Sequence, residues 1–384
     1  MIAARTYLDY NATSPLRPEA RDAMTRALDG FGNASSVHAE GRRARAMIEA
    51  ARAEVAALAG ADAREVTFTS GATEAANWVV SQPWQRMIVS AVEHPAVMAP
   101  ALRSGTRVEV LPVDSLGYVD PGALGVLIDS ALNDGSKCHA ASVLVAVQHA
   151  NNETGVVQPI AEIVAIARER GVRVLVDAVQ TAGRVTLDQR GHAIDFMVMS
   201  SHKIGGPQGA GALVVREDVK LEPLLVGGGQ ERGRRAGTEN VAAIAGFGAA
   251  AAASRRELER TDRFAKLRDA LEAALKHATP DMAVIGGDAE RLCNTTLVAL
   301  PGASAETAVI ALDLAGVAAS AGAACSSGKA SRSPVLAAMG IGDDIARCAV
   351  RFSLGWATTE DDIARCTAAW QRVDRIRRGV RQVA

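Results

Sequence analysis

Short runs of β-branched and other apolar residues alternate with longer stretches rich in Ala, Arg and Glu between about residues 65 and 215. The apolar runs have the length of buried strands, and most of the intervening stretches have a helical pattern. Seven strands are predicted, at residues 66–69, 87–90, 108–111, 142–147, 172–176, 196–199 and 212–215. This alternation predicts an α/β fold built around a doubly wound, mainly parallel sheet.

The pattern changes after about residue 250. A long charged helix is predicted at residues 254–278, followed by shorter apolar segments near residues 294–300 and 350–354. These segments predict a smaller C-terminal α/β domain. We therefore expect a large domain at residues 13–252 and a small domain formed by residues 1–12 and 253–384.

Composition and charge exclude several classes of protein. The 384 residues are 48% hydrophobic, which is enough for a sizeable core and excludes disorder as the main description. Lys and Arg total 42 against 43 Asp and Glu, so no bulk attraction to nucleic acid or to an anionic membrane is expected. The uncharged, Ala-rich run at residues 241–254 is too short to span a bilayer, and the first residues lack the apolar core of a signal peptide. We expect a soluble cytoplasmic protein that binds neither membranes nor nucleic acid directly.

Two local features have more than one interpretation. The Arg-rich C-terminal stretch, residues 372–381, is expected to be an exposed helix face, either solvated or used to dock a partner. The five cysteines, Cys138, Cys293, Cys325, Cys348 and Cys366, are too widely spaced for a CxxC metal or redox site. Each is expected to be a small buried residue unless another signal singles it out.

Polar residues follow several predicted strands, at the sheet edge where ligands bind in open parallel sheets. Residues 70–73, which include Ala72 and Thr73, open a helix and can bind a phosphate through backbone N–H groups, although ordinary helix caps use the same residues. His94 follows the second strand and Asn152 follows the fourth. Each of these alone is compatible with ordinary loop chemistry.

Asp177 and Lys203 make the pattern more specific. Asp177 ends an apolar strand, where it acts either as a helix cap or as the counter-charge of a protonated ring nitrogen. Lys203 follows another apolar strand, a position suited to Schiff-base chemistry, although a lone lysine there is more often a surface residue. A phosphate site, an aspartate and a downstream lysine beside His202 together predict a pyridoxal 5'-phosphate (PLP) site.

Motifs along nearly the whole chain support this interpretation. They are residues 7–13 (YLDYNAT), 31–33 (FGN), 68–74 (FTSGATE), 151–155 (NNETG), 176–180 (VDAVQ), 201–207 (SHKIGGP), 227–233 (GGGQERG), 235–238 (RAGT) and 351–355 (RFSLG). With these motifs the chain resembles the cysteine desulfurases of the NifS and IscS type, which are PLP-dependent enzymes of the class-V aminotransferase family. The resemblance implies fold type I, the aspartate-aminotransferase-like fold, and a homodimer.

The resemblance also implies a role for each matching residue. Lys203 is expected to bind PLP covalently and later to transfer protons, with Asp177 on the pyridinium nitrogen and His94 stacked on the ring as a further catalytic residue. Arg351 is expected to bind the substrate α-carboxylate. Other contacts are implied as well. For PLP they are Ala72, Thr73, Asn152, Gln180, Ser200, Ser201, His202 and, from the second subunit, Thr238; for substrate they are Asn11 and Asn152.

Cys325 is the one cysteine that the resemblance singles out. It lies among small and polar residues in a segment from about 320 to 334, where these enzymes carry their catalytic cysteine. The implied reaction converts L-cysteine to L-alanine and leaves a persulfide on Cys325, which passes to an acceptor such as an iron-sulfur scaffold protein. No metal is expected in the isolated enzyme, although Cys325 is a potential shared cluster ligand.

Two alternatives remain open at this point. Another PLP-dependent lyase or aminotransferase, for example one acting on selenocysteine, would keep turnover without the Cys325 thiol. A docking platform for a sulfur acceptor would not need Lys203 at all. The sequence does not identify the acceptor or its pathway.

Overall fold

The computed structural model describes residues 5–133, 135, 138–322 and 332–383, so Cys325 lies outside the described residues. Its largest sheet has seven strands in the order β2-β8-β7-β6-β5-β3-β4. They are β2 (Val66–Thr69), β3 (Arg86–Ser90), β4 (Arg107–Leu111), β5 (Val143–Gln148), β6 (Arg173–Asp177), β7 (Phe196–Ser200) and β8 (Gly211–Val215). Only β8 runs antiparallel to its neighbours, which confirms the predicted mainly parallel sheet.

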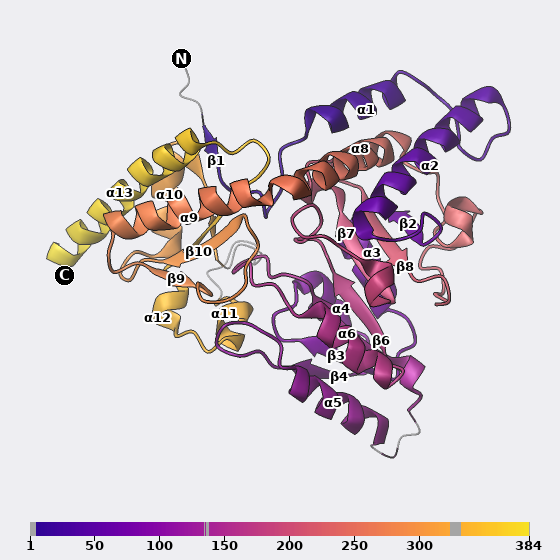
Figure 1. Ribbon diagram of the computed structural model, residues 1–384, viewed down its shortest axis with the longest axis horizontal. Helices are drawn as coiled ribbons and strands as arrows, with labels where there is room; N and C mark the ends of the chain where they lie inside the picture. The colour runs from indigo at the N-terminus through magenta and orange to yellow at the C-terminus, as the bar shows by residue number, and fades with distance from the viewer. Residues whose placement is uncertain (1–4, 134, 136–137, 323–331, 384) are drawn as a thin grey trace.

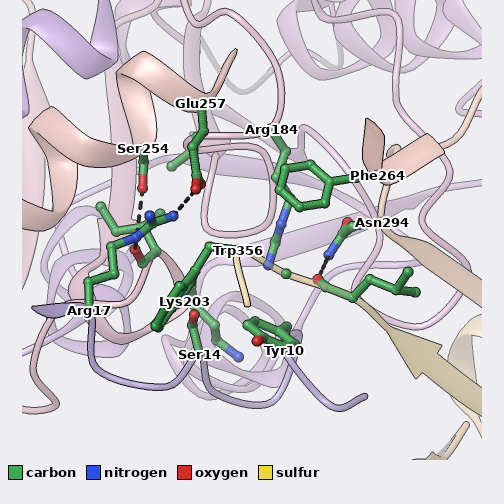
Figure 2. A pocket seen from close by; sticks show the side chains of 15 residues that line it. Tyr10, Ser14, Arg17, Arg184, Lys203, Ser254, Glu257, Phe264, Asn294 and Trp356 are labelled. Atoms are coloured by element: carbon green, nitrogen blue, oxygen red, sulfur yellow. Dashed lines mark hydrogen bonds and ion pairs between the residues drawn. The ribbon is translucent and has the colours of Figure 1, made fainter. Parts of the chain in front are cut away.

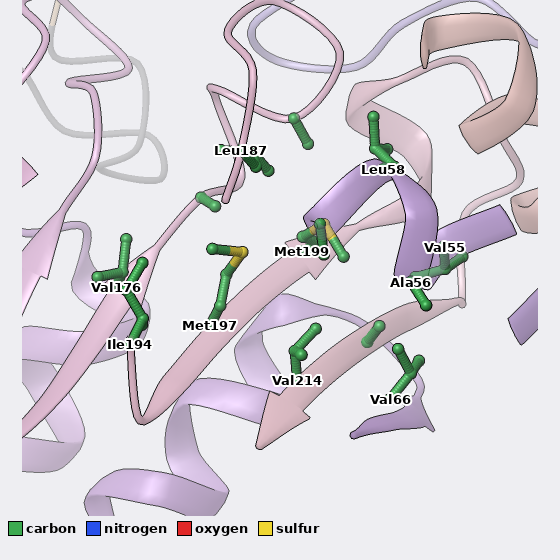
Figure 3. Close-up of a cluster of buried hydrophobic side chains, with 14 of the residues drawn as sticks. Val55, Ala56, Leu58, Val66, Val176, Leu187, Ile194, Met197, Met199 and Val214 are labelled. Carbon is green, nitrogen blue, oxygen red and sulfur yellow. The ribbon is translucent and has the colours of Figure 1, made fainter. Parts of the chain in front are cut away.

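Helices lie on both faces of this sheet (Figure 1). They are α1 (Pro18–Leu28), α2 (Ala39–Ala59), α3 (Ala72–Val80), α4 (Pro95–Arg103), α5 (Pro121–Asn133), α6 (Ile160–Glu169), α7 (Gln189–His192) and α8 (Val241–Glu257), with single 3-10 turns η1 (Ala140–Ser142), η2 (Ser201–Lys203) and η3 (Gln230–Gly233). Successive strand residues enter opposite cores: Met197 and Met199 pack on the α2 side, and Phe196 and Val198 pack on the α3 side. Figure 3 shows the first of these cores, with Met199 close to Leu58 of α2.

A second group of elements surrounds a smaller antiparallel sheet in the order β12-β13-β10-β9. Its strands are β9 (Ala283–Ile285), β10 (Thr295–Ala299), β12 (Ser320–Ala321) and β13 (Ala349–Ser353), while β1 (Thr6–Tyr7) pairs separately with β11 (Val317–Ala318). The helices are α9 (Thr261–Ala278), α10 (Ala305–Leu314), α11 (Pro334–Ala338), α12 (Asp343–Ala346) and α13 (Glu360–Val383). Phe352 and Trp370 stack edge to face in its core.

One prediction about helices is wrong. The single helix expected at residues 254–278 is the end of α8, a 3-10 turn η4 (Leu258–Arg260) and then α9. The break separates two helices that bury different cores: α8 packs in the core of the large sheet, and α9 packs through Leu267 and Leu271 in that of the small sheet. The C-terminal stretch is helical with an exposed face at Arg372, Arg375 and Arg378, as predicted, while Arg377 on its other side is buried and pairs with Asp374 and Asp281.

The described cysteines differ in exposure. Cys348 and Cys366 are buried as predicted, whereas Cys138 and Cys293 are partly exposed. Within the described ranges, no helix is long and apolar enough to cross a membrane. The same part of the chain holds no group of three or more His, Cys, Asp or Glu side chains arranged to bind a metal ion.

Candidate active site

A cavity of about 700 Å³ lies at the carboxyl ends of the central parallel strands. Pockets of this size commonly hold a cofactor or small substrate. It brings together most of the residues that the sequence singles out: Asn11, Ala72, Thr73, His94, Asn152, Asp177, Gln180, Ser200, His202, Lys203 and Arg351. Arg351 comes from β13 of the small sheet, so both groups of elements contribute to the cavity.

The start of α3 forms one end of the cavity. Gly71 precedes the helix, and the first backbone N–H groups, including those of Ala72 and Thr73, have no acceptor within it. Gly211 of β8 packs against this turn so closely that a Cβ atom would lie 2.6 Å from the Gly71 Cα atom. The resulting cradle of N–H donors at a helix N-terminus suits a phosphate group.

Glu74 and Arg235 secure this end of the cavity. The Ser70 N–H donates to a Glu74 carboxylate oxygen at 2.8 Å, and Arg235 Nε donates to the other oxygen at 2.9 Å. Burial raises the pKa of Glu74, but the bonds to Arg235 and Ser70 outweigh burial, so the pKa is lowered from its usual value. Both residues lie in motifs quoted from the sequence, but only the fold shows that they pair across 161 positions.

Lys203 and Asp177 lie at the ends of adjacent parallel strands. Lys203 Nζ donates to the backbone carbonyls of Asn11 at 2.5 Å and Ala12 at 2.9 Å. Asp177 accepts a 2.9 Å hydrogen bond from the Val179 N–H. Burial raises the pKa of Asp177 to about 6, against the opposing effects of that hydrogen bond and of Lys203. The Asp177 carboxylate therefore gains from any further cation in the cavity, such as a protonated ring nitrogen.

A second carboxyl group, Glu93, lies behind Asp177 and was not identified from the sequence. It is buried, one oxygen accepts from the Gln148 N–H, and the other has no partner among the described residues. Burial and the Asp177 charge hold the pKa of Glu93 well above its usual range. Both causes favour the uncharged form of Glu93 and so oppose a second negative charge beside Asp177.

His94 and His202 are neutral rings on two sides of the cavity. His94 Nδ1 accepts from the Ala96 N–H at 3.1 Å at the start of α4, and His202 Nδ1 lies 3.1 Å from the Thr13 hydroxyl. Burial, followed by the nearby Lys203 charge, lowers the pKa of each ring to about 4. Both rings remain available as planar faces or hydrogen-bonding groups that bear no charge.

Arg351 points its guanidinium into the same cavity from β13. It donates to the Asp9 carboxylate from Nη2 at 2.7 Å and to the Asn152 carbonyl from Nη1 at 3.0 Å. Asn11, predicted as a substrate contact, has its amide bonded to Thr295 at 2.9 Å and to Asn294 at 3.3 Å. The Asn11 amide thus attaches the N-terminal segment to β10.

A second, much smaller cavity lies on the other side of Lys203 (Figure 2). Its volume of about 30 Å³ has room for a water molecule and not for a cofactor. Arg17 pairs with Glu257 at 2.5 Å across it and lies over the Trp356 ring. This cavity therefore belongs to the packing between the N-terminal segment and α8.

Among the described residues, two predicted site residues do not line the main cavity. Ser201 is buried beneath it, with its hydroxyl oxygen lacking a partner among the described residues. Thr238 is exposed and lies outside the cavity, and Cys325 falls outside the described residues. The remaining donor set fits PLP: N–H groups for phosphate, a carboxylate for a ring nitrogen, an uncharged imidazole and a lysine amine.

Comparisons with known proteins agree with this donor set. The aminotransferase class-V family model matches residues 6–366. A cysteine desulfurase IscS of Dictyoglomus turgidum is 38% identical over 93% of this chain and 91% of its own length, and a cysteine desulfurase of Nostoc sp. is 41% identical over 94% and 90%. Among solved structures, a NifS-like protein from Rickettsia africae superposes with a TM-score of 0.88 at 33% identity, covering 96% of this chain and 99% of the other.

Proposed function

Because the chain belongs to the class-V aminotransferase family and is similar to cysteine desulfurases over almost all of its length, we propose that it removes sulfur from L-cysteine with PLP as its cofactor. The products are L-alanine and a persulfide on Cys325. The observation that carries this proposal is the convergence of Lys203, Asp177 and Arg351 on one cavity beside a phosphate-binding helix start.

Different residues of the cavity would contact different parts of the cofactor. The N–H groups of Ala72 and Thr73 would bind its phosphate, joined by Ser200 and His202, and Asp177 would pair with its ring nitrogen. When bound, PLP holds the substrate amino group and accepts the electron pair left at Cα when that carbon loses its proton. The Asp177 carboxylate would favour this electron acceptance because it stabilises the proton on the ring nitrogen.

Neutral His94, Asn152 and Gln180 complete the contacts around the ring. His94 presents an uncharged face, so it adds no repulsion to the Lys203 amine. Gln180 is oriented by its own bonds, since its amide donates to the Asn11 carbonyl at 3.1 Å and accepts from Arg184 at 2.8 Å. Its position is therefore fixed before a ligand arrives.

Arg351, Lys203 and Cys325 act on the substrate. Arg351 binds the α-carboxylate through two N–H groups, a geometry that lysine cannot reproduce. Lys203 removes the Cα proton and returns protons later. The Cys325 thiolate attacks the substrate sulfur, so that an S–S bond forms as the Cβ–S bond breaks. Cβ takes the electron pair and a proton, and the substrate leaves as alanine.

Several further assignments are part of this proposal. Residues 13–252 form the cofactor-binding domain, and residues 1–12 with 253–384 form the second domain. A homodimer is supported by large apolar side chains that are mostly exposed in the single chain, Phe31, Val37 and Val226, and by exposed Thr238 near Arg235. The free thiols of Cys293, Cys348 and Cys366 suit a cytoplasmic location, and an acceptor protein such as an iron-sulfur scaffold takes the persulfide sulfur.

The test uses two variants of the PLP-loaded protein. Cys325→Ser should retain the cofactor absorbance and its change on addition of L-cysteine, but form no persulfide. Lys203→Ala should form neither alanine nor persulfide. Sustained sulfide release by Cys325→Ser would contradict the role of Cys325. Turnover on selenocysteine alone would favour a selenocysteine lyase instead.

A further inference from the structure

Arg351 is held by a carboxylate that also contacts a residue on the N-terminal side of Cys325. Asp9 Oδ1 accepts from Arg351 Nη2 at 2.7 Å, and Asp9 Oδ2 accepts from the Ser320 hydroxyl at 2.9 Å. Ser320 stands directly opposite Arg351 in the ladder between β12 and β13. Asp9 therefore bridges the guanidinium and the strand that precedes Cys325 in the sequence.

On the C-terminal side of Cys325, the Glu153 carboxyl bonds to Ser333 and is linked to Arg351 only through the backbone of its neighbour Asn152. Glu153 is buried and follows Asn152, whose carbonyl accepts from Arg351 Nη1 at 3.0 Å. The Ser333 hydroxyl donates to Glu153 Oε2 at 2.7 Å, and the same hydroxyl caps the first turn of α11. Burial raises the pKa of Glu153 to about 7, while the Ser333 hydrogen bond and the Arg351 charge oppose that rise.

We propose that Asp9 and Glu153 are positioning residues of the substrate site. Asp9 orients the Arg351 guanidinium directly, and Glu153 holds the segment whose Asn152 carbonyl accepts from it. Through Ser320 and Ser333, both acids connect this arrangement to the chain on both sides of Cys325. This inference rests on the proposed function, since it takes Arg351 as the carboxylate-binding group. The two serines are described residues that flank Cys325 in the sequence.

The hydrogen bonds of the Arg351 guanidinium show why its orientation matters for binding a carboxylate. A guanidinium has five N–H donors in one plane. One on Nη2 goes to Asp9 and one on Nη1 goes to the Asn152 carbonyl, while Nε is buried with no partner among the described residues. Each terminal nitrogen keeps one N–H, and these two can bind both oxygens of a carboxylate. Loss of Asp9 frees the guanidinium to rotate out of that plane.

The first test compares removal of the carboxyl at position 9 with its conservative replacement. In PLP-loaded Asp9→Ala, KM for L-cysteine should rise about tenfold, the loss expected for a charge-assisted hydrogen bond, with kcat changed much less. Asp9→Asn keeps an oxygen acceptor for Arg351 Nη2, so KM should stay at or below the wild-type value. Binding of L-alanine, measured by calorimetry, should follow the same order.

The matched pair Glu153→Ala and Glu153→Gln applies the same comparison to the other acid, so the test does not depend on one variant folding. The control is Asp374→Asn, which weakens a buried pair with Arg377 far from the cavity. Asp374→Asn should lower the free energy of unfolding without the selective rise in KM. If Asp9 and Glu153 have a purely structural role, their variants should show the same changes in stability, KM and kcat as this control.

The second test addresses the serines. The double variant Ser320→Ala/Ser333→Ala should slow persulfide formation on Cys325 several-fold in a single turnover, with L-alanine binding unchanged, because Asp9 still holds Arg351. The control is Ser304→Ala, since Ser304 caps α10 by accepting from the Thr307 N–H and does not line the cavity. Both variants lose a helix cap, but only the double variant loses the links to Asp9 and Glu153.

The outcomes separate this inference from the proposed function. Wild-type protein that forms no alanine from L-cysteine would overturn the proposed function itself. If the wild type is active, equal KM values in wild type and in both alanine variants at positions 9 and 153 would overturn the inference. It would also be overturned if Asp9→Asn and Asp9→Ala behaved alike, or if the double serine variant matched Ser304→Ala.

Discussion

Replacing Asp177 with asparagine should stabilise the cofactor-free protein at neutral and alkaline pH. In the free cavity, burial raises the pKa of Asp177 from 3.8 to about 6, so the folded state resists ionising this carboxyl group. Asparagine keeps an oxygen that can accept from the Val179 N–H and carries no charge. The substitution therefore removes an electrostatic cost and leaves the local hydrogen bond in place.

The size and sign of the effect follow from proton linkage. An acid with a raised pKa in the native state favours folding at low pH, and this advantage is lost as pH rises from about 4 through about 6. Above that range the ionised carboxylate costs about 3 kcal/mol, and at pH 5 about half of that. Asp177 is partly exposed to the cavity, so screening by water reduces the cost at pH 8 to about 2 to 3 kcal/mol.

Urea unfolding of the cofactor-free proteins at pH 8 and pH 5, followed by the fluorescence of buried Trp78 and Trp370, measures this difference. Asp177→Asn should be more stable than wild type at pH 8, with a smaller gain at pH 5. Added PLP should reverse the order, because its ring nitrogen supplies the cation that Asp177 lacks. The control is Asp195→Asn, which should destabilise the protein because Asp195 pairs with two arginines.

Two results would refute this reasoning. One is an Asp177→Asn protein that is less stable than wild type at pH 8 without cofactor. The other is a stability difference that does not change between pH 5 and pH 8, since a titrating carboxyl group must produce such a change.

Three further predictions concern other parts of the molecule. Glu231→Gln should destabilise the protein by about 3 to 5 kcal/mol in urea unfolding, because it leaves the charge of fully buried Arg52 without its bidentate partner; a change below about 1 kcal/mol would mean that water reaches the pair. Arg351→Lys should raise KM for L-cysteine at least about tenfold, as one ammonium cannot bind both carboxylate oxygens, and an unchanged KM would place the substrate carboxylate elsewhere. The His94 ring, with its pKa lowered to about 4, should show no NMR titration between pH 5.5 and 8, and a midpoint near 6.5 would contradict its burial.

The sequence predicted the sheet well because each strand has its own local signal. Strand β7, for example, is apolar at every position up to Ser200, and both faces of it are buried. The break between α8 and α9 was missed because helical residues continue through it, and only the packing of the two helices on different cores requires a turn.

The candidate site was predictable where a motif contains the whole feature. Lys203 and Asp177 follow apolar strands, and parallel strand ends meet at one sheet edge. The pairing of Asp9 with Arg351 spans 342 positions, and Glu93 acquires its buried environment from β5 and β6. Such contacts depend on tertiary packing, and a single sequence does not show them.

Adding L-cysteine to the PLP-loaded wild-type protein and quantifying alanine and persulfide in the same sample tests the desulfurase reaction itself. In a single turnover, we expect one alanine for each persulfide, with the additional sulfur found by mass spectrometry on the peptide that contains Cys325. Alanine formed without a persulfide on that peptide would contradict it.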